Sequence, residues 1–444
     1  MVAEENSGKP PVKERAAWSR VEAGADAWQD AIQNLASGAW SLFGLWGDVD
    51  AVHLAVLCQD DDPRILTMKC AGGGFPSVAA RHPPATRLER AISDLFGHAP
   101  IGAHDTRGWL DHGRWGVKHP LGSAANSADT GDIYPFLPTE GPGLHHIPVG
   151  PVHAGIIEPG HFRFTANGET VVRLEERLGY VHKGIESLMA GSDLDRGAHL
   201  AGRTSGDSTV AYAFAFARAA EAAHGVRPPP RAVWLRALMA ELERLANHFG
   251  DIGAICNDAS FALMHTHCGM LRELVLRACD ACFGHRLMRD RILPGGVTVD
   301  LSADGAELLG NLMRHIKAAF PELVELYDNT ASLQDRTVGT GVLTSELARQ
   351  YGCGGYVGRA SGRAFDTRRT LAYEPYDQLQ FEVAVRTEGD VDARVRVRMK
   401  EVDQSISIMD QILGRLPNSD LRTELPAHTG EIREGVGVVE GFRG

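Results

Sequence analysis

The sequence predicts an α+β protein, in which a small N-terminal α+β domain is followed by a mainly α-helical domain with a peripheral β-hairpin or small sheet. Short apolar or alternating runs bounded by Gly, Asp and Pro fill residues 39–70. Two further alternating runs flank an Asn-Gly pair at Asn167. After Gly184, long stretches place apolar residues three and four positions apart. Alternation is typical of half-buried strands, and the longer spacing is typical of amphipathic helices.

The composition is that of an ordinary globular protein. Its 444 residues are 43% hydrophobic and 23% charged, which allows two domains with sizeable cores. The net charge of -12 argues against nucleic acid as a partner, because an acidic surface repels phosphates. The chain has no apolar run of membrane-spanning length and its polar N-terminus does not resemble a signal peptide, so we expect a cytoplasmic protein.

The N-terminal domain is expected over residues 16–121, after a disordered tail at residues 1–15 that has almost nothing to bury. The runs LFGLWG, VDAVHLAVLC and RILTMKC predict strands. The segment RLERAISDLFG predicts a short helix, because its apolar side chains share one face. These side chains are Leu88, Ile92, Leu95 and Phe96.

The second domain is expected over residues 149–444. Residues 122–148 are dense in Gly, Ser, Pro and Asp, which predicts a connecting segment. The Asn-Gly pair that follows is the strongest short signal for a hairpin. Helical stretches then run to about Ala331, and VRVRMKEVDQSISIMDQILGRL predicts a last helix. The run VGVVEGF near the end is a candidate closing strand.

Seven motifs in the second domain occur in the order of a known family. They are GPVHAGIIEPGHFRF from Gly150, ERLGYVHKGIESL from Glu176, SGDSTVAYAFAF from Ser205, LERLANHFGDIGAICND from Leu242, LPGGV from Leu293, DRTVGTGVLT from Asp335 and GRASGRAFDTRRTLAYEPYDQLQFEV from Gly358. This domain resembles the quinone-site large subunit (the D-type subunit) of respiratory complex I. It resembles more closely the large subunits of membrane-bound energy-converting nickel-iron hydrogenases and formate hydrogenlyase, whose fold it is therefore expected to share.

The first domain is similar to the small complex I subunit (the C-type subunit) that is often fused in front. The segment RLERAISDLFG is followed by HDTRGWLDHGRW and HPL, as in that small subunit. The chain thus resembles a fusion of the two neighbouring subunits over residues 40–444. The resemblance implies an oxidoreductase subunit with three kinds of partner: a small iron-sulfur protein that is hydrogenase-like or similar to the B-type subunit of complex I, a ferredoxin-like subunit, and antiporter-like membrane subunits. Through them it would lie on the inner face of the cell membrane.

The cysteines that such hydrogenases use to bind nickel and iron are missing from their expected places. The family holds the metals with two CxxC pairs, because soft thiolates suit them. The first pair would follow Arg203, where RTSGDS has Ser205 and Ser208 instead. The second would lie beyond Gly444. We therefore expect neither a nickel-iron centre nor metal ligands in this chain. No cofactor is assigned to the chain itself. The iron-sulfur cluster is expected in a partner subunit.

A further expectation follows because the chain ends earlier than the sequences of the family it resembles. In the family the missing tail helps to close the core. The chain should therefore expose apolar surface at residues 436–442 and be unstable without a partner.

Two other groupings have metal-like spacing. Cys279 and Cys282 form a CxxC inside a helical pattern, at a place where the family has no ligand, which favours a structural role. The HTHC run at residues 265–268 lacks a second half, which disfavours a metal site.

A proton-exchanging site is expected from residues that match the family. His153 matches the first of two histidines at the quinone pocket of complex I, and Asp258 matches an aspartate beside them. A carboxylate that orients an imidazole raises its pKa and suits proton donation, although a purely structural His-Asp bond is the alternative. Glu158 resembles the glutamate that passes protons beside the nickel, and Glu186 belongs to a second shared motif. For these two the alternatives are a loop ion pair and a favourable interaction with a helix N-terminus.

Departures from complex I bear on quinone binding. Ile157 replaces the second histidine, and His199 replaces the tyrosine expected three residues after Arg196. A quinone headgroup would lose hydrogen-bond donors there, so quinone stays an open alternative.

Three arginines are candidates for cofactor binding through their motifs. Arg203, Arg359 and Arg368 match arginines that line the interface with the iron-sulfur subunit or the outer shell of the site.

A redox subunit without its own metal centre is the leading hypothesis. A non-catalytic scaffold, a true hydrogenase or formate hydrogenlyase subunit, and an NADH-quinone oxidoreductase subunit remain as alternatives.

Overall fold

The structure, a computed structural model, describes residues 18–58, 62–70, 72–113, 115–123, 126–127, 135–150, 159–426 and 430–444. The chain divides into two compact units. One consists of Ser19–Ala190, and the other of Gly191–Gly444 with Trp18. The hairpin at Asn167 therefore groups with the small N-terminal domain. The predicted disordered tail lies outside the described residues.

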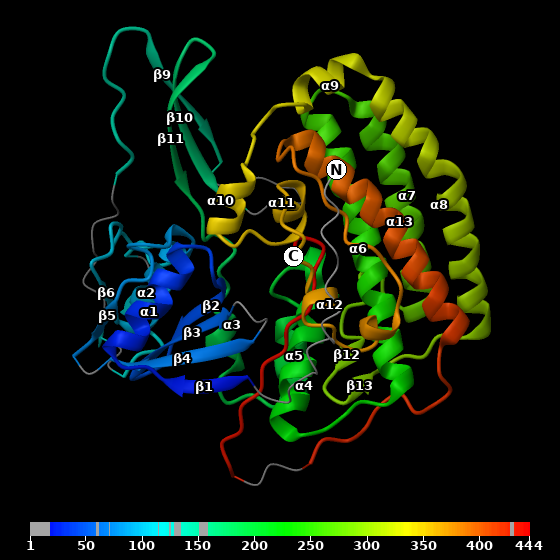
Figure 1. The fold of residues 1–444 in the computed structure, drawn as a ribbon, viewed down its shortest axis with the longest axis horizontal. Helices are drawn as coiled ribbons and strands as arrows, with labels where there is room; N and C mark the ends of the chain where they lie inside the picture. The colour runs from blue at the N-terminus through cyan, green and yellow to red at the C-terminus, as the bar shows by residue number, and fades with distance from the viewer. Residues whose placement is uncertain are drawn as a thin grey trace. The chain divides into compact units, whose positions relative to one another are not determined.

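The first unit is built on a four-stranded sheet covered by helices (Figure 1). The strands are β1 (Ser19–Glu22), β2 (Ser41–Gly47), β3 (Ala51–Leu57) and β4 (Pro63–Lys69), in the order β1-β4-β3-β2. Helices α1 (Ala25–Ala36) and α2 (Thr86–Phe96) contribute Trp28, Leu35 and Ile92 to its core. The three predicted strands and the predicted helix are confirmed, and the structure adds β1 and α1 before them.

Polar residues of α2 hydrogen-bond to the segments that precede and follow the helix. Glu89 accepts three hydrogen bonds from residues 77–79 at 2.5–3.0 Å. Arg90 donates to residues 105–108 at 2.7–3.1 Å, and Asp94 accepts the backbone N–H groups of residues 109–111. Buried polar groups must find partners, so α2 and these loops specify each other.

The first unit also contains a three-stranded antiparallel sheet, in the order β11-β10-β9. Its strands are β9 (Leu144–Val149), β10 (His161–Asn167) and β11 (Thr170–Arg177). The predicted hairpin is confirmed: Asn167 pairs with Thr170, and Gly168 has a positive φ of 59°. The prediction of a plain connecting segment at 122–148 misses β9. This is an edge strand, where Pro148 is tolerated because its missing N–H need not join a ladder.

Smaller elements fill the rest of this unit. They are the parallel pair β5 (Gly74–Pro76) and β6 (Ala99–Ile101), the antiparallel pair β7 (Val117–Lys118) and β8 (Asn126–Ser127), and α3 (Ile185–Met189).

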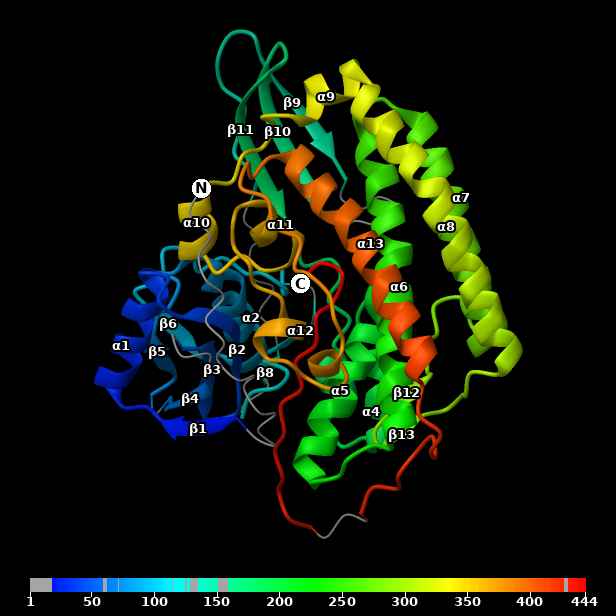
Figure 2. The ribbon, with the colours of Figure 1, turned by 45° about the vertical axis from the view of Figure 1, so that its right-hand side comes forward.

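The second unit is a helical bundle around α6 (Pro230–Asp258), as the rotated view in Figure 2 also shows. The other elements are α4 (Leu194–Ala201), α5 (Thr209–His224), α7 (Ala262–Phe283), β12 (Ile292–Leu293), β13 (Gly296–Val297), α8 (Ala303–Asn329), α9 (Ala331–Thr337), α10 (Ser345–Gln350), α11 (Gly355–Ala360), α12 (Thr367–Thr370) and α13 (Val391–Arg415). Helix α6 packs against α5, α7 and α13, and α8 packs against α7. None of the helices in the described part of the chain combines the length and apolar character needed to cross a lipid bilayer.

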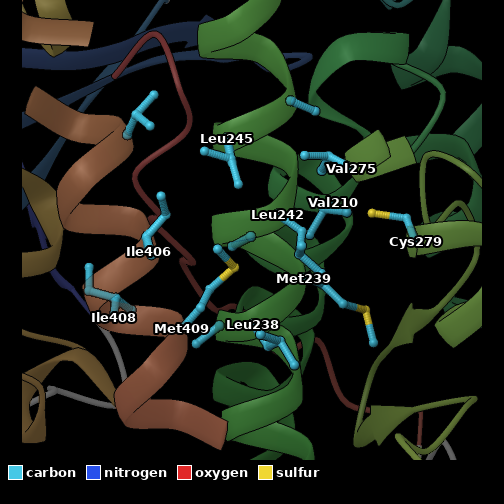
Figure 3. Packing of buried hydrophobic residues seen from close by; sticks show 14 of the residues in the cluster. Val210, Leu238, Met239, Leu242, Leu245, Val275, Cys279, Ile406, Ile408 and Met409 are labelled. Carbon is cyan, nitrogen blue, oxygen red and sulfur yellow. The ribbon is translucent and has the colours of Figure 1, made fainter. Parts of the chain in front are cut away.

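Helix α6 is buried on most of its surface, which explains why its sequence is apolar on more than one face. Pro230 lies in its first turn, where the missing N–H costs nothing. Leu238, Leu242 and Leu245 lie between side chains of α13 and of α7 (Figure 3). A helix packed on so many sides is a rigid support for polar residues placed along it.

The end of the chain differs from expectation. Residues 430–444 run without regular secondary structure, so the candidate strand VGVVEGF does not form. Phe442 is only 2% exposed, so the apolar surface expected at residues 436–442 does not include its ring, whereas Val436, Val438 and Val439 are half-buried. Gly437 lets the segment approach α5 closely, because a Cβ atom there would lie 2.1 Å from the carbonyl oxygen of Ala215.

Candidate functional site

The turn before α5 contains the two serines that replace the family's thiolates. Residues 206–208 form one 3-10 turn, which leads directly into α5. Both serine hydroxyls donate to the carboxylate of Asp207, Ser205 through a short bond and Ser208 at 3.4 Å. Oδ2 of Asp207 also lies 2.8 Å from a guanidinium nitrogen of Arg443. We refer to Ser205, Asp207 and Ser208 as the serine turn.

Two side chains of α6 form hydrogen bonds with the serine turn and with the first residues of α5. Glu243 accepts the backbone N–H groups of Val210 and Ala211, at 2.7 and 3.0 Å, so its carboxyl group caps the N-terminus of α5. One turn later, Asn247 donates to the backbone carbonyl of Asp207 at 2.6 Å. The positions i and i+4 of a helix lie on the same face, so both side chains reach the same segment.

A cavity of about 10 Å³ lies between the serine turn and α7, close to the size at which a single water fits. Its lining includes Asp207, Glu243, Asn247, Arg272 and Cys279. Burial raises the pKa of Glu243 to about 8, with a smaller contribution from the charge of Asp207, while the two backbone N–H groups oppose this shift.

Replacing Glu243 by glutamine is expected to change how the stability of the protein depends on pH. The folded pKa of about 8 lies above the ordinary value of 4.5, so the proton on Glu243 stabilises the fold at low pH. This contribution is lost as the pH rises from 4.5 to 8, at a slope of at most about 1.4 kcal/mol per pH unit. Urea unfolding at several pH values should show wild type losing stability relative to Glu243→Gln over this range. The exposed Glu325→Gln on α8 is the control, and equal slopes for wild type and Glu243→Gln would refute the assignment.

A second polar group fills the core beside the serine turn. We call it the buried ion network, and its members are Glu241, Arg244, Arg359, Asp366, Arg368, Glu401 and Glu440, all of them 0–3% exposed at the side chain. Arg368 lies 2.7 Å from Asp366 and 3.0 Å from Glu241. Arg359 lies 2.5 Å from Glu401 and 2.8 Å from Glu440.

Hydrogen bonds from neutral groups complete the network. Tyr376 and Ser405 each donate to Glu241 at 2.7 Å. Burial opposes ionisation of Glu241, but the guanidinium groups of Arg368 and Arg244 hold its pKa below the ordinary value. Glu241 is therefore ionised although it has no contact with solvent.

The structure separates the arginines that the sequence grouped together. Arg359 and Arg368 lie in the buried ion network. Arg203 is exposed and makes a bidentate ion pair with Asp290, at 2.6 and 2.8 Å. Their predicted role in cofactor binding stays a prediction.

Of the four predicted proton-exchanging residues, two are described. Asp258 is the last residue of α6 and is exposed, and Glu186 is exposed in the first turn of α3. His153 and Glu158 lie outside the described residues. The predicted contact between His153 and Asp258 therefore stays a prediction.

The CxxC pair lies on α7, as the helical pattern predicted. Cys279 is 1% exposed, and burial raises the pKa of its thiol. Burial also raises the pKa of Cys282 to about 11. Thiols with raised pKa values are poor nucleophiles and poor metal ligands at neutral pH. In the described part of the chain, no three His, Cys, Asp or Glu side chains gather as a metal-binding group.

Sequence reasoning singled out Arg359 and Arg368 but overlooked Glu243, Asp207 and the carboxylates that pair with these two arginines. One signal was present in LMAELERLANHF: Glu241, Arg244 and His248 are spaced three and four positions apart, so they share a face of an otherwise apolar helix. Charged residues on a buried face imply partners elsewhere in the core.

Comparison with known proteins places these features in a family. Residues 258–436 match the family model of the 49 kDa subunit of respiratory-chain NADH dehydrogenase. The chain is 32% identical to formate hydrogenlyase subunit 5 of Escherichia coli over 79% of its own length, and it spans 63% of that protein. It is 34% identical to a carbon monoxide-induced hydrogenase of Rhodospirillum rubrum, over 61% of this chain and 76% of that one. It is 27% identical to the C/D subunit of an NADH-quinone oxidoreductase of Bacteroides fragilis, over 83% and 74%. The predicted fusion of a C-type part and a D-type part is thereby confirmed.

Proposed function

Because this chain belongs to the family of the 49 kDa subunit of respiratory-chain NADH dehydrogenase and its hydrogenase relatives, we propose that it is a redox subunit of a membrane-associated complex. In this proposal it receives electrons from an iron-sulfur cluster in a partner subunit. It couples their arrival to the movement of protons or other ions, without a nickel-iron centre of its own.

The serine turn is the observation that carries the proposal. Nickel and iron with their small diatomic ligands need thiolates, whereas Ser205 and Ser208 present hydroxyl groups. Both hydroxyls are already hydrogen-bonded to Asp207. This oxygen donor set does not fit a soft metal centre.

Proton exchange is the chemistry that the same residues support. Asp207 and Glu243 line one water-sized cavity, and Glu243 has a pKa close to neutrality. A carboxyl group with such a pKa can both accept and release a proton under cellular conditions. The serine turn would thus keep the place of the family's reaction centre but exchange only protons.

The partners follow from the same proposal. A small iron-sulfur subunit would deliver the electrons, with a ferredoxin-like subunit before it, and antiporter-like membrane subunits would use the coupled proton movement. The chain would be attached to the inner face of the membrane through these partners. Arg203 is exposed, and its ion pair with Asp290 fixes its position, so an iron-sulfur partner would contact this residue.

Purification of the native complex from its host through a tag on the N-terminus tests the proposal. We expect an iron-sulfur subunit to copurify, and we expect metal analysis to find iron but no stoichiometric nickel. Nickel in a one-to-one ratio with the chain would refute the proposal in favour of a true hydrogenase subunit.

A second measurement distinguishes a redox subunit from a scaffold. Asp207→Asn should leave the complex assembled but slow its coupled electron transfer by about a hundredfold or more, because general acid-base groups contribute at least that much. Unchanged electron transfer in assembled complexes carrying Asp207→Asn or Asp258→Asn would favour the scaffold. The exposed Asp304→Asn, in the first turn of α8, is a matched control.

A further inference from the structure

The outward face of helix α7 carries a row of exposed apolar side chains that the proposed function does not use. Leu263, Met270 and Leu274 are 50%, 61% and 38% exposed. With the exposed His267 between them they follow the spacing i, i+4, i+7 and i+11, so they share one face over about 16 Å of the helix. Single exposed apolar residues need no explanation, but a group of them on one face indicates an interaction surface.

Arginine side chains border this row at the C-terminal end of α7. Arg277 lies three positions after Leu274 and therefore on the same face of the helix. Arg277 and Arg286 share the carboxylate of Glu273, each at 2.9 Å, and both arginines are exposed. The Nε atom of Arg289, in the loop after α7, has no hydrogen-bond partner in the described part of the chain. Because one carboxylate serves two arginines, the surface keeps an excess of positive charge.

The charge of this segment is opposite to that of the whole chain. Residues 272–291 contain five arginines and three carboxylates, whereas the chain as a whole has a net charge of -12. These residues are Arg272, Arg277, Arg286, Arg289 and Arg291, with Glu273, Asp280 and Asp290. A guanidinium group can bind a carboxylate through two parallel N–H bonds, so a cluster of arginines suits an acidic partner.

A protein surface fits this arrangement better than a lipid surface does. An apolar centre with a polar border, rich in arginine and methionine, is typical of interfaces between proteins. The carboxylates of Glu273 and Asp290 lie among the arginines and would repel the uniform layer of headgroups that an anionic bilayer presents. A protein can instead place its carboxylates opposite individual arginines.

We propose that the outward face of α7 and residues 284–291 form a docking surface for a partner subunit that presents an apolar patch bordered by aspartate or glutamate. We call this surface the α7 surface. The inference rests on the proposed function only because it requires a partner subunit. The docked partner would lie beside the serine turn, because Arg272 and Arg286 also line the cavity at that turn.

Photo-cross-linking in the native complex tests the contact. The residue p-benzoylphenylalanine replaces Met270 in the tagged chain, and mass spectrometry identifies the peptide that irradiation links to it. We expect a peptide of another subunit in which apolar residues are accompanied by Asp or Glu. The same replacement at Leu347 on α10, which is also 38% exposed, is the control and should give no such link. No link from position 270, or a link to lipid, to a second copy of this chain or to a peptide without acidic residues, overturns the proposal.

Two variants measure what the apolar row and the arginines contribute. Leu274→Asp and Arg286→Glu should each lower the amount of that subunit recovered with the chain by about tenfold or more, as expected for the central residues of an interface. The loss caused by Arg286→Glu should be larger at low ionic strength, because salt screens exposed charges. Unchanged circular dichroism spectra and melting temperatures of the purified chains will show that both variants are folded.

Matched substitutions elsewhere on the helical unit are the controls for these variants. Leu347→Asp changes an equally exposed leucine, and Arg386→Glu changes an exposed arginine whose ion pair with Glu388 measures 2.8 Å. Both should retain the partner subunit. Equal recovery of that subunit with wild type, Leu274→Asp and Arg286→Glu overturns the α7 surface and leaves the proposed function standing. The absence of any cluster-bearing subunit refutes the proposed function, whereas a link from position 270 to a subunit without a cluster would still support the α7 surface.

Discussion

Arg359→Ala is expected to lower the free energy of unfolding of the helical unit by about 3–5 kcal/mol. Arg359 is fully buried and compensates Glu401 at 2.5 Å and Glu440 at 2.8 Å. Its removal leaves two carboxylates in a solvent-free core without their counter-charge. Removing one partner of a buried ion pair is strongly destabilising, because the remaining charge is uncompensated. Urea unfolding of the full chain, followed by far-UV circular dichroism, measures the change.

Two controls separate the loss of charge pairing from other effects. Arg359→Lys keeps the positive charge but cannot reach both carboxylates, so its stability should lie between those of wild type and Arg359→Ala. Arg277→Ala removes an arginine whose ion pair with Glu273 is exposed, and it should change stability little. Equal effects of Arg359→Ala and Arg277→Ala would show that the buried ion network does not hold the fold together.

Phe249→Ala should destabilise the bundle by a similar amount, about 3–5 kcal/mol, for an unrelated reason. The ring of Phe249 is fully buried on α6 and packs edge-on against Phe320 of α8, with centroids 5.4 Å apart. Truncation removes buried apolar surface and leaves a cavity, and both terms oppose folding. In a unit of this size we expect a fall in melting temperature of about 6–15 °C.

The solvent-facing side of the bundle provides the comparison for this variant. Leu263 on α7 is 50% exposed, so Leu263→Ala should shift the melting temperature only slightly. If Phe249→Ala melts within about 2 °C of wild type, a shift that corresponds to at most about 1 kcal/mol, Phe249 does not join α6 to α8 in the way that its ring contact indicates.

The parts of the fold that were predictable depend on local signals. The Asn-Gly turn at Asn167 predicted the hairpin, and the apolar spacing of Ile92 and Leu95 predicted the buried face of α2. Strand β9 was missed because its sequence, LHHIPV, lacks alternation and contains a proline. It exists because β10 offers it a partner, which local sequence cannot reveal.

The candidate site was predictable only where a motif marked it. The positions of Ser205 and Ser208 followed from the family pattern, but the role of Asp207 between them required the structure. The buried ion network joins residues far apart in the chain, such as Arg359 and Glu440, which are 81 positions apart. Pairing over such distances is set by packing, so charge spacing along the sequence shows only that partners are needed.

The C-terminal segment illustrates the same limit. Its glycines and apolar residues suggested a strand or an exposed patch. In the structure, Glu440 instead brings a carboxylate to Arg359 and accepts the backbone N–H of Thr367 at 2.8 Å. The buried carboxylate of Glu440 thus helps to fix a segment that the buried ring of Phe442 and the ion pair between Arg443 and Asp207 also hold in place.

Helix α6 contributes to both polar clusters through neighbouring rows of side chains. Glu243 and Asn247 face the serine turn, and Glu241, Arg244 and His248 face the buried ion network. Successive residues of a helix are rotated by about 100°, so inserting or deleting one residue within 241–248 would turn part of both rows away from their partners. Natural variation in this family should accordingly favour substitutions over insertions or deletions within this segment of α6. A circular permutation or a loop insertion in α6 should abolish both clusters at once.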